Sequence, residues 1–136
     1  MSAQANLQLY DGQSSPVLKT FSARGASLDL ARYIDVSSGL GIGLPTITLG
    51  NRTTQGTNGA YRVEGRVTVP ILEALSGDAG GYVAVPKVAF NMFGKIEMVA
   101  PNRASSQNRK DLKAYVTNLM AHAVMASLFV DFDQPT

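Results

Sequence analysis

Two segments of the chain, residues 61–70 and 90–101, alternate apolar side chains with other side chains at a period of two. Successive side chains of a strand point to opposite faces, so the alternation predicts two strands of a half-buried sheet. The apolar set is Tyr61, Val63, Val67, Val69, Phe90, Met92, Ile96 and Met98. The opposite set is Arg62, Glu64, Arg66, Thr68, Asn91, Phe93, Lys95 and Glu97. The sheet therefore needs another element to cover its apolar face, and its charged face carries an aromatic side chain.

The length of 136 residues predicts one domain over residues 1–136. Within it we expect a hairpin over about residues 1–24, an antiparallel sheet over 28–99 and helices over 105–131. Hydrophobic residues make up 45%, whereas charged residues make up only 16%, below the roughly one quarter that is usual. Such a composition fits equally a surface buried against other subunits and a polar, uncharged monomer. The net charge of +2 is small for one chain, but it would add up over many subunits.

Residue content argues against several kinds of chemistry. The chain has no cysteine and a single histidine, His122, with no carboxylate within a helical turn of it. We therefore predict no enzyme activity, no catalytic residue, no metal site and no cofactor. No apolar run approaches the roughly 18 residues that span a bilayer. The first residues lack the features of a secretory signal, so we expect a cytoplasmic protein.

The first hundred residues are predicted to form strands. Residues 7–10 and 17–22 flank an Asp11-Gly12 turn and predict a hairpin. Further strands are expected in the second half of residues 28–36, at 46–49, in a long segment ending at Pro70, and at 87–99. Connections are expected at residues 37–43, 51–59 and 76–81. The glycines of residues 39–43 precede a strand rather than a helix, so they predict a hinge and not a phosphate-binding loop.

Beyond Pro101 the apolar spacing becomes helical, at Leu112, Tyr115, Val116, Leu119, Met120, Ala123 and Val124. We predict one long helix, or two helices with a bend near His122, capped at the start by Ser105 or Ser106. Strands followed by helices indicate an α+β fold. Residues 116–130 are nearly all apolar, which is more than one buried stripe requires. This favours an intertwined homodimer over a monomer with a thick helix–sheet core.

The charged face is a candidate nucleic-acid site. Arg and Lys bind phosphates, Thr and Asn hydrogen-bond exposed bases, and an aromatic ring stacks an unpaired base. The alternative is an ordinary solvated face of an antiparallel sheet. The side chains that could lie on this face together are Thr46, Thr48, Arg62, Glu64, Arg66, Thr68, Asn91, Phe93 and Lys95.

Taken in order, these features resemble the coat proteins of single-stranded RNA bacteriophages of the levivirus type. The resemblance covers nearly the whole chain and rests on an ordered set of features rather than on one motif. It includes a strand that runs into Asp11-Gly12, a Val-x-Val-Pro strand end at residues 67–70, and a loop with glycines and a proline. The aromatic-rich strand at residues 90–101 and the helical C-terminal region complete it.

The resemblance implies an N-terminal β-hairpin, a five-stranded antiparallel sheet and two C-terminal α-helices. Two chains would interlock as a homodimer with a ten-stranded sheet, each chain's helices crossing the other's sheet. Dimers would self-assemble in the bacterial host cytoplasm into an icosahedral shell, the virion capsid, around single-stranded genomic RNA. In studied relatives, the inner sheet face also binds an RNA hairpin at the replicase start and represses translation. No membrane partner is implied.

The resemblance also carries roles to particular positions. The RNA-binding set that it implies is Thr46, Thr48, Arg62, Glu64, Arg66, Asn91, Phe93 and Lys95. Phe93 stands where relatives often have a base-stacking tyrosine, and Thr46 and Thr48 fall near an adenine pocket. Contacts between dimers are implied for the loop that holds Gly77, Gly80, Gly81 and Pro86. The alternative function is a dimeric RNA-binding regulator that does not assemble.

Overall fold

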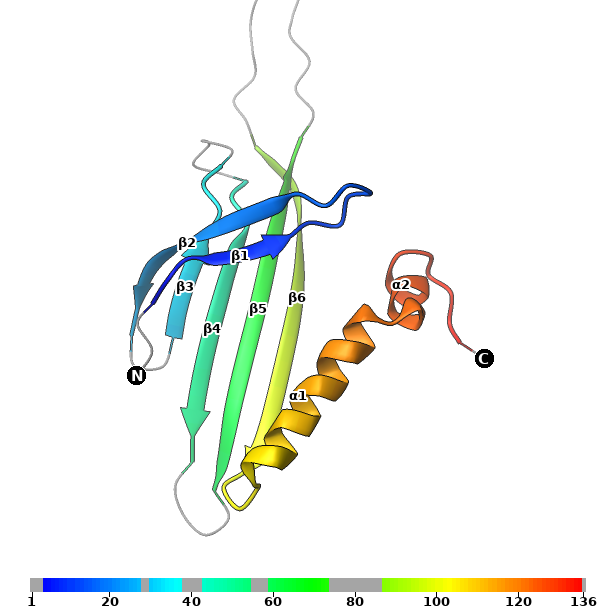
Figure 1. Ribbon diagram of the computed structural model, residues 1–136. Coiled ribbons are helices and arrows are strands. Elements are labelled where there is room, and N and C mark those ends of the chain that lie inside the picture. The colour runs from blue at the N-terminus through cyan, green and yellow to red at the C-terminus, as the bar shows by residue number, and fades with distance from the viewer. Residues whose placement is uncertain (1–3, 28–29, 38–42, 55–58, 74–86, 136) are drawn as a thin grey trace, which may run out of the picture. The chain divides into compact units, whose positions relative to one another are not determined.

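The computed structural model describes residues 4–27, 30–37, 43–54, 59–73 and 87–135. Its elements, in chain order, are β1 (Leu7–Tyr10), β2 (Leu18–Ala26), β3 (Leu30–Ile34), β4 (Thr46–Thr53), β5 (Ala60–Leu72), β6 (Val88–Pro101), α1 (Ser106–Ala121) and α2 (Ala123–Phe129) (Figure 1). The chain divides into two compact units, residues 1–53 with 62–97, and residues 54–61 with 98–136. The first unit holds most of the sheet, and the second holds the two helices. The α+β class and the two C-terminal helices are confirmed.

The strands form a single sheet in the order β1-β2-β3-β4-β5-β6. At its start, β1 and β2 form the predicted antiparallel hairpin, with Leu7 opposite Phe21 and Tyr10 opposite Leu18. The Asp11 carboxylate closes the turn by accepting hydrogen bonds from the backbone N–H groups of Val17 (2.9 Å) and Gln13 (3.3 Å). The bond from Val17 is the main reason why the pKa of Asp11 lies below its usual value. A short acidic side chain thus holds this turn.

The expected hairpin plus five-stranded sheet is wrong in its strand count, because the described residues contain six strands in one order. Strand β2 serves both the hairpin and the sheet. It pairs with β3 through Ala23 opposite Tyr33, and the register then shifts before Ala26 pairs with Ala31. Gly25, with φ +102°, lies in that shift, where a backbone without a Cβ is favoured.

The strands also extend beyond their predicted ends. Strand β4 continues through residues 51–53, which we expected to be a connection. The Asn and Thr side chains of this segment favour turns, yet the strand continues through them to Thr53, so local preference does not decide its end. The loop that holds Gly77, Gly80, Gly81 and Pro86, and most of the predicted hinge at residues 39–43, fall outside the described residues.

A small apolar core lies on one face of the N-terminal half of the sheet. Phe21, Tyr33 and Ile47 are the buried hydrophobic side chains of the described residues, and Leu7, Ala23 and Ala31 pack against them. Tyr33 lies directly opposite Ile47 across the β3–β4 pair. Three buried side chains make a modest core for a chain of 136 residues. Much of the remaining apolar surface is therefore exposed in the single chain.

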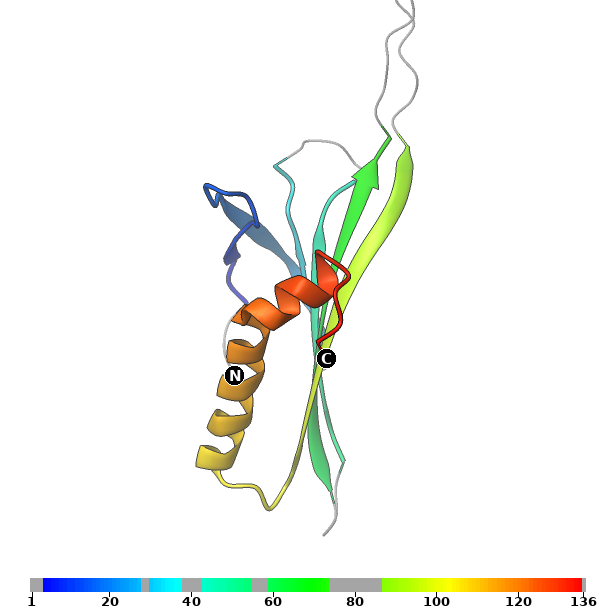
Figure 2. The same ribbon diagram turned by 90° about the vertical axis from the view of Figure 1, so that its right-hand side faces the viewer.

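Of the two predicted alternatives, one long helix or two helices with a bend near His122, the structure shows the second. The Ser105 Oγ accepts a hydrogen bond from the Asn108 N–H at 3.1 Å and caps the start of α1. His122 has an extended backbone, so α1 ends before it, and its ring Nδ1 accepts a hydrogen bond from the Val124 N–H at 3.2 Å. Figure 2 shows that α1 and α2 run in different directions. The single histidine therefore separates two helices and caps the second.

We predict that His122→Ala lowers the free energy of unfolding by about 1 kcal/mol, because the cap of α2 is lost. His122→Asn restores most of the loss, since an Asn side chain can accept the same bond from the Val124 N–H. Urea denaturation of the assembled protein measures both variants. Equal losses for the two variants would show that the cap contributes nothing.

Candidate nucleic-acid interface

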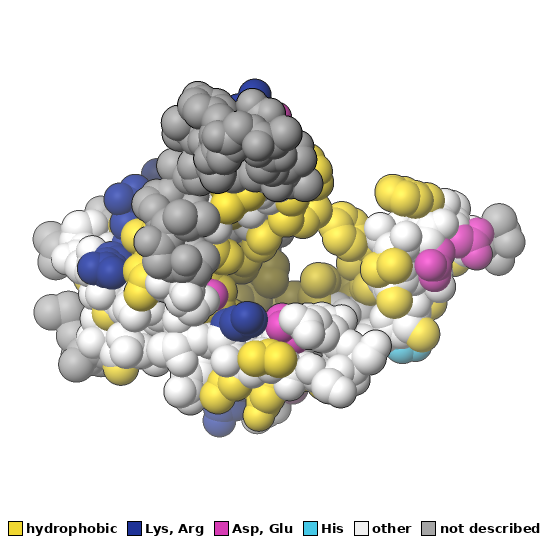
Figure 3. Space-filling view, turned by 90° about the horizontal axis from the view of Figure 1, so that it is seen from above, with side chains coloured by type: hydrophobic (Ala, Val, Ile, Leu, Met, Phe, Trp, Pro, Cys, Tyr) yellow, Lys and Arg dark blue, Asp and Glu magenta, His cyan; other side chains and the backbone are white. Residues whose placement is uncertain are grey.

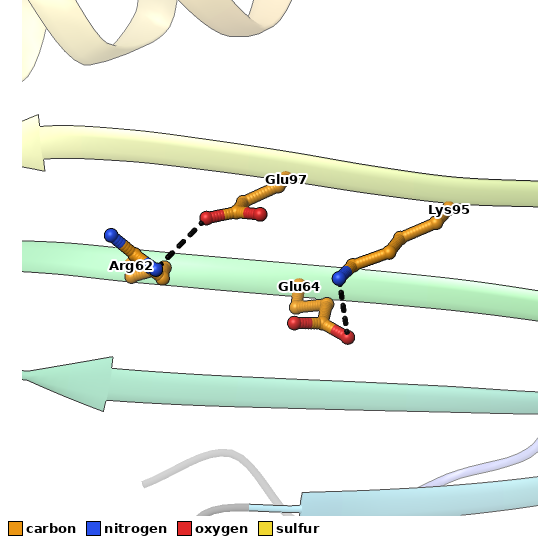
Figure 4. A network of polar contacts seen from close by, with 4 residues as sticks. All are labelled: Arg62, Glu64, Lys95 and Glu97. Carbon is orange, nitrogen blue, oxygen red and sulfur yellow. Dashed lines mark ion pairs between the residues drawn. The ribbon is translucent and has the colours of Figure 1, made fainter.

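Cross-strand contacts place the charged side chains of β5 and β6 on one face of the sheet. The Arg62 Nη1 lies 3.1 Å from the Glu97 Oε1, and the Lys95 Nζ lies 3.4 Å from the Glu64 Oε1 (Figure 4). The guanidinium carbon of Arg66 lies 4.5 Å from the centre of the Phe93 ring. These three contacts advance by two residues along each strand in opposite directions, as expected for neighbours on one face of an antiparallel pair.

A pocket of about 320 Å³ extends this face toward β3 and β4. It is lined by Leu30, Thr48, residues 50–52, Arg62 and Glu64. Thr48 lies opposite Arg32 across the β3–β4 pair, and Thr46, two residues earlier on the same strand, lies opposite Ile34. Both threonines are half-buried. Leu30 provides an apolar part of the wall, and Thr48, Asn51, Arg52, Arg62 and Glu64 bring polar side chains to it.

The structure thus brings most of the candidate residues together. Thr48, Arg62 and Glu64 share the pocket, and Lys95, Arg66 and Phe93 adjoin it through the contacts above. Asn91 is exposed and lies on the same face of β6 as Phe93, because two residues separate them. Phe93 is 64% exposed, so part of its ring is available to a ligand despite the Arg66 stack.

Three polar residues near this site were not among the candidates. Asn51 and Arg52 line the pocket, but they lie in the segment predicted to be a loop. Glu97 pairs with Arg62, and its place in the alternation of residues 90–101 was a usable signal. The alternation placed Glu97 on the charged face, but only its contact with Arg62 across the strands makes it part of the site.

The charges of this face largely compensate one another. Strands β5 and β6 bring Arg62, Arg66 and Lys95 against Glu64 and Glu97, which leaves a formal charge of one positive unit from three cations and two carboxylates. The paired side chains are between 38% and 53% exposed. Ion pairs at such exposure contribute only about 0–1 kcal/mol to stability. These ion pairs therefore neutralise charge and fix the positions of their side chains, but they add little to the free energy of folding.

The opposite face of the same strands is apolar. Gly65 alternates with Glu64 and Arg66, so a side chain at position 65 would point to this apolar face. A Cβ at that position would lie 3.5 Å from the Leu49 Cδ2, which places Leu49 on the same face. Phe90, Met92 and Ile96 alternate with the charged side chains of β6, and each is more than 40% exposed in the single chain. Hydrophobic side chains, yellow in Figure 3, are accordingly visible at the surface.

Other kinds of site find no support in the described part of the chain. It contains no group of three His, Cys, Asp or Glu side chains that could hold a metal ion. Over the same residues, neither helix has the length and apolar character needed to cross a bilayer. The charged face can bind an anion with its cations and a planar ring with Phe93, and the pocket beside it can receive a base-sized group.

Comparison with known proteins identifies the class. A family model for levivirus coat proteins matches residues 2–135. The chain therefore belongs to the levivirus coat protein family, and its role is that of a structural capsid protein rather than an enzyme. The family resemblance seen in the sequence is confirmed.

Solved structures show the same fold. The virus-like particle of bacteriophage ESE058 is similar with a TM-score of 0.89 at 22% identity, covering 99% of this chain and 100% of that one. The virus-like particle of bacteriophage NT-214 has a TM-score of 0.83 at 28% identity over 99% and 100% of the two chains. The capsid protein of bacteriophage GA has a TM-score of 0.70 at 13% identity over 93% and 94%. Comparison with curated proteins gives no match.

We predict that Glu64→Gln and Glu97→Gln each change the free energy of unfolding by less than about 0.5 kcal/mol, because their ion pairs are half-exposed. Ile47→Ala, which empties a buried position, is expected to cost about 2–5 kcal/mol and serves as the contrast. Chemical denaturation measures all three variants. A loss near that of Ile47→Ala in either glutamate variant would contradict the small contribution assigned to the ion pairs.

Proposed function

We propose that two copies of this chain form an interlocked homodimer, that dimers assemble into an icosahedral shell, and that the charged sheet face binds single-stranded RNA inside it. The observation that carries the proposal is the pairing of a charged face with extensive exposed apolar surface in a coat-protein fold. The virus-like particles of bacteriophages ESE058 and NT-214 support assembly, since their chains share this fold over almost their full length. The place of action is then the virion, after assembly in the host cytoplasm.

The helices support the dimer. No residue of α1 or α2 is buried in the single chain. Tyr115 is 72% exposed, Leu119 55% and Phe129 75%. Large apolar side chains gathered on one element indicate a protein interface, because leaving them in water costs about 25 cal/mol for each Å² of apolar area. A second copy with an exposed apolar sheet face is the partner that fits them.

The edge of the sheet supports the same dimer. Strand β6 is 14 residues long and ends the strand order, so it has a neighbour only on its β5 side among the described strands. A long edge strand presents a row of unpaired N–H and C=O groups and readily pairs with another chain. Pairing of β6 with β6 of the second copy would join five strands from each chain into the ten-stranded surface that the family resemblance implies. Both charged faces would then lie on the same side.

The charged face supports RNA as its ligand. Arg62, Arg66 and Lys95 can contact phosphates, and the exposed part of the Phe93 ring can stack an unpaired base. The pocket beside Thr48 has room for a base. An RNA hairpin with unpaired bases is the ligand that uses all three features, and its binding at the replicase start would repress translation. Asn91 and Thr46 extend the same surface.

We predict that Leu119→Asp prevents dimer formation and hence shell assembly, because a charge would be buried against the partner. A side chain that stayed exposed would tolerate the same change. Asn118→Asp, a neighbouring exposed polar position, is the matched control and leaves assembly intact. Size-exclusion chromatography measures both variants. Normal shells from Leu119→Asp would contradict the proposed dimer.

We predict that Arg66→Glu shells contain less nuclease-protected RNA than wild-type shells, because the cation that stacks on Phe93 becomes a repelling charge. Lys87→Glu reverses a charge that is paired with Glu73 just outside the ends of β5 and β6, away from the Arg66–Phe93 contact, and it is expected to leave the RNA content unchanged. The ratio of absorbance at 260 and 280 nm and the extracted RNA give the measurement. Equal RNA contents in the two variants would remove this face as the RNA site.

The shell itself is tested by size-exclusion chromatography and electron microscopy of the recombinant protein. Uniform shells with protected RNA support the proposal. A small dimer that binds an RNA hairpin but forms no shell would instead support the alternative, a regulator that does not assemble. A dimer without nucleic acid and without affinity for RNA would contradict both functions.

A further inference from the structure

Two carboxylates occupy the middle of the charged face and hold two of its cations. Glu97 Oε1 lies 3.1 Å from Arg62 Nη1, and Glu64 Oε1 lies 3.4 Å from Lys95 Nζ (Figure 4). All four side chains come from β5 and β6, so the pairs form across neighbouring strands. Arg66, the third cation of these strands on this face, stacks on Phe93 instead of pairing with a carboxylate.

This arrangement makes a plain polyphosphate a poor ligand. A phosphate that approaches Arg62 or Lys95 must displace a carboxylate, and the displaced carboxylate remains beside the phosphate as a like charge. The same displacement is favourable when the ligand also brings hydrogen-bond donors, because the carboxylate then exchanges one partner for another. The donors available on unpaired RNA bases include the exocyclic amino groups of cytosine, adenine and guanine.

The pocket gives one carboxylate access to a base. Glu64 lines it together with Thr48 and Arg62, so a base that enters the pocket can meet a carboxylate, a hydroxyl and a guanidinium. Uracil carries a carbonyl oxygen where cytosine carries its amino group. A uracil at that position would direct an acceptor toward the Glu64 acceptor.

We propose that Glu64 and Glu97 are specificity-determining residues of the RNA face, which neutralise Arg62 and Lys95 until an unpaired, amino-bearing base is bound. The proposal rests on the proposed function, since it requires RNA on this face. The carboxylates lower affinity for RNA in general and select RNA whose unpaired bases present amino groups. Glu64 acts on the base within the pocket, and Glu97 acts by holding Arg62.

The test compares short oligocytidylate and oligouridylate of equal length, which differ at the amino group and the carbonyl. Dissociation constants are measured over a range of KCl concentrations, with protein kept at concentrations where chromatography shows no shells. Wild-type protein is expected to bind oligocytidylate about tenfold more tightly, the effect of one hydrogen bond to a charged group. Glu64→Gln is expected to bind oligouridylate more tightly than wild type and to lose the preference, because an amide offers both a donor and an acceptor.

The salt dependence gives an independent readout. Each cation released from its carboxylate adds about 0.7 to the slope of log affinity against log salt for a single strand. Both Glu64→Gln and Glu97→Gln are therefore expected to steepen the slope. Glu73→Gln is the matched control, because it removes a carboxylate from the Lys87 ion pair of similar length, which lies just outside the ends of β5 and β6. Its slope and its preference are expected to equal those of wild type.

The outcomes separate the two proposals. Glutamate variants that behave like Glu73→Gln, while Arg66→Gln still weakens binding, would overturn the role of the carboxylates and leave the RNA face intact. Weaker binding of both oligonucleotides by Glu64→Gln would also overturn it. No binding by any form, with Arg66→Gln indistinguishable from wild type, would overturn the RNA face itself.

Discussion

Exposed apolar surface on a single chain is the constraint on which this structure depends. The buried core described here contains three hydrophobic side chains, whereas the two helices bury none of theirs. The apolar face of β6 is also exposed, and among the described strands β6 has a neighbour on one side only. A protein with so little buried area is only marginally stable alone, so folding and association are expected to be coupled. In a coat protein that forms the proposed homodimer, this coupling is useful, because the subunit would become stable as it acquires its partner.

The charged face follows from the same strands. Period-two alternation gives β5 and β6 one apolar face and one charged face, so a single pair of strands carries both the surface proposed for association and the surface proposed for RNA. Most of the charges that β5 and β6 bring to the charged face are paired, and the ion pairs add little stability because they are half-exposed. Their value lies in fixing the positions of Arg62 and Lys95 and in limiting the net positive charge. On the proposed function, the face that contacts RNA then need not bind every RNA equally.

Much of this organisation could be predicted from the sequence because it is local. The alternation in residues 61–70 and 90–101 predicted two strands and their faces. The apolar spacing predicted the helical region and gave a bend near His122 as one of two alternatives. Features that depend on pairing between strands could not be obtained in this way. Strand β4 extends through residues 51–53, which the sequence alone indicated to be a connection. Asn51 and Arg52 were therefore not among the candidates, although they line the pocket. The pairing of Arg62 with Glu97 likewise depends on the register of β5 and β6, which alternation leaves open.

Hydrogen exchange of individual backbone amides along β6 tests the central claim, that a second copy completes this sheet, most directly. In a paired strand, amides that point toward β5 and amides that point away from it are both hydrogen-bonded. If a second copy pairs with β6, both sets exchange slowly over Val88–Pro101 in the purified protein. Slow exchange on the β5 side with fast exchange at alternate residues would show an open edge and contradict this claim.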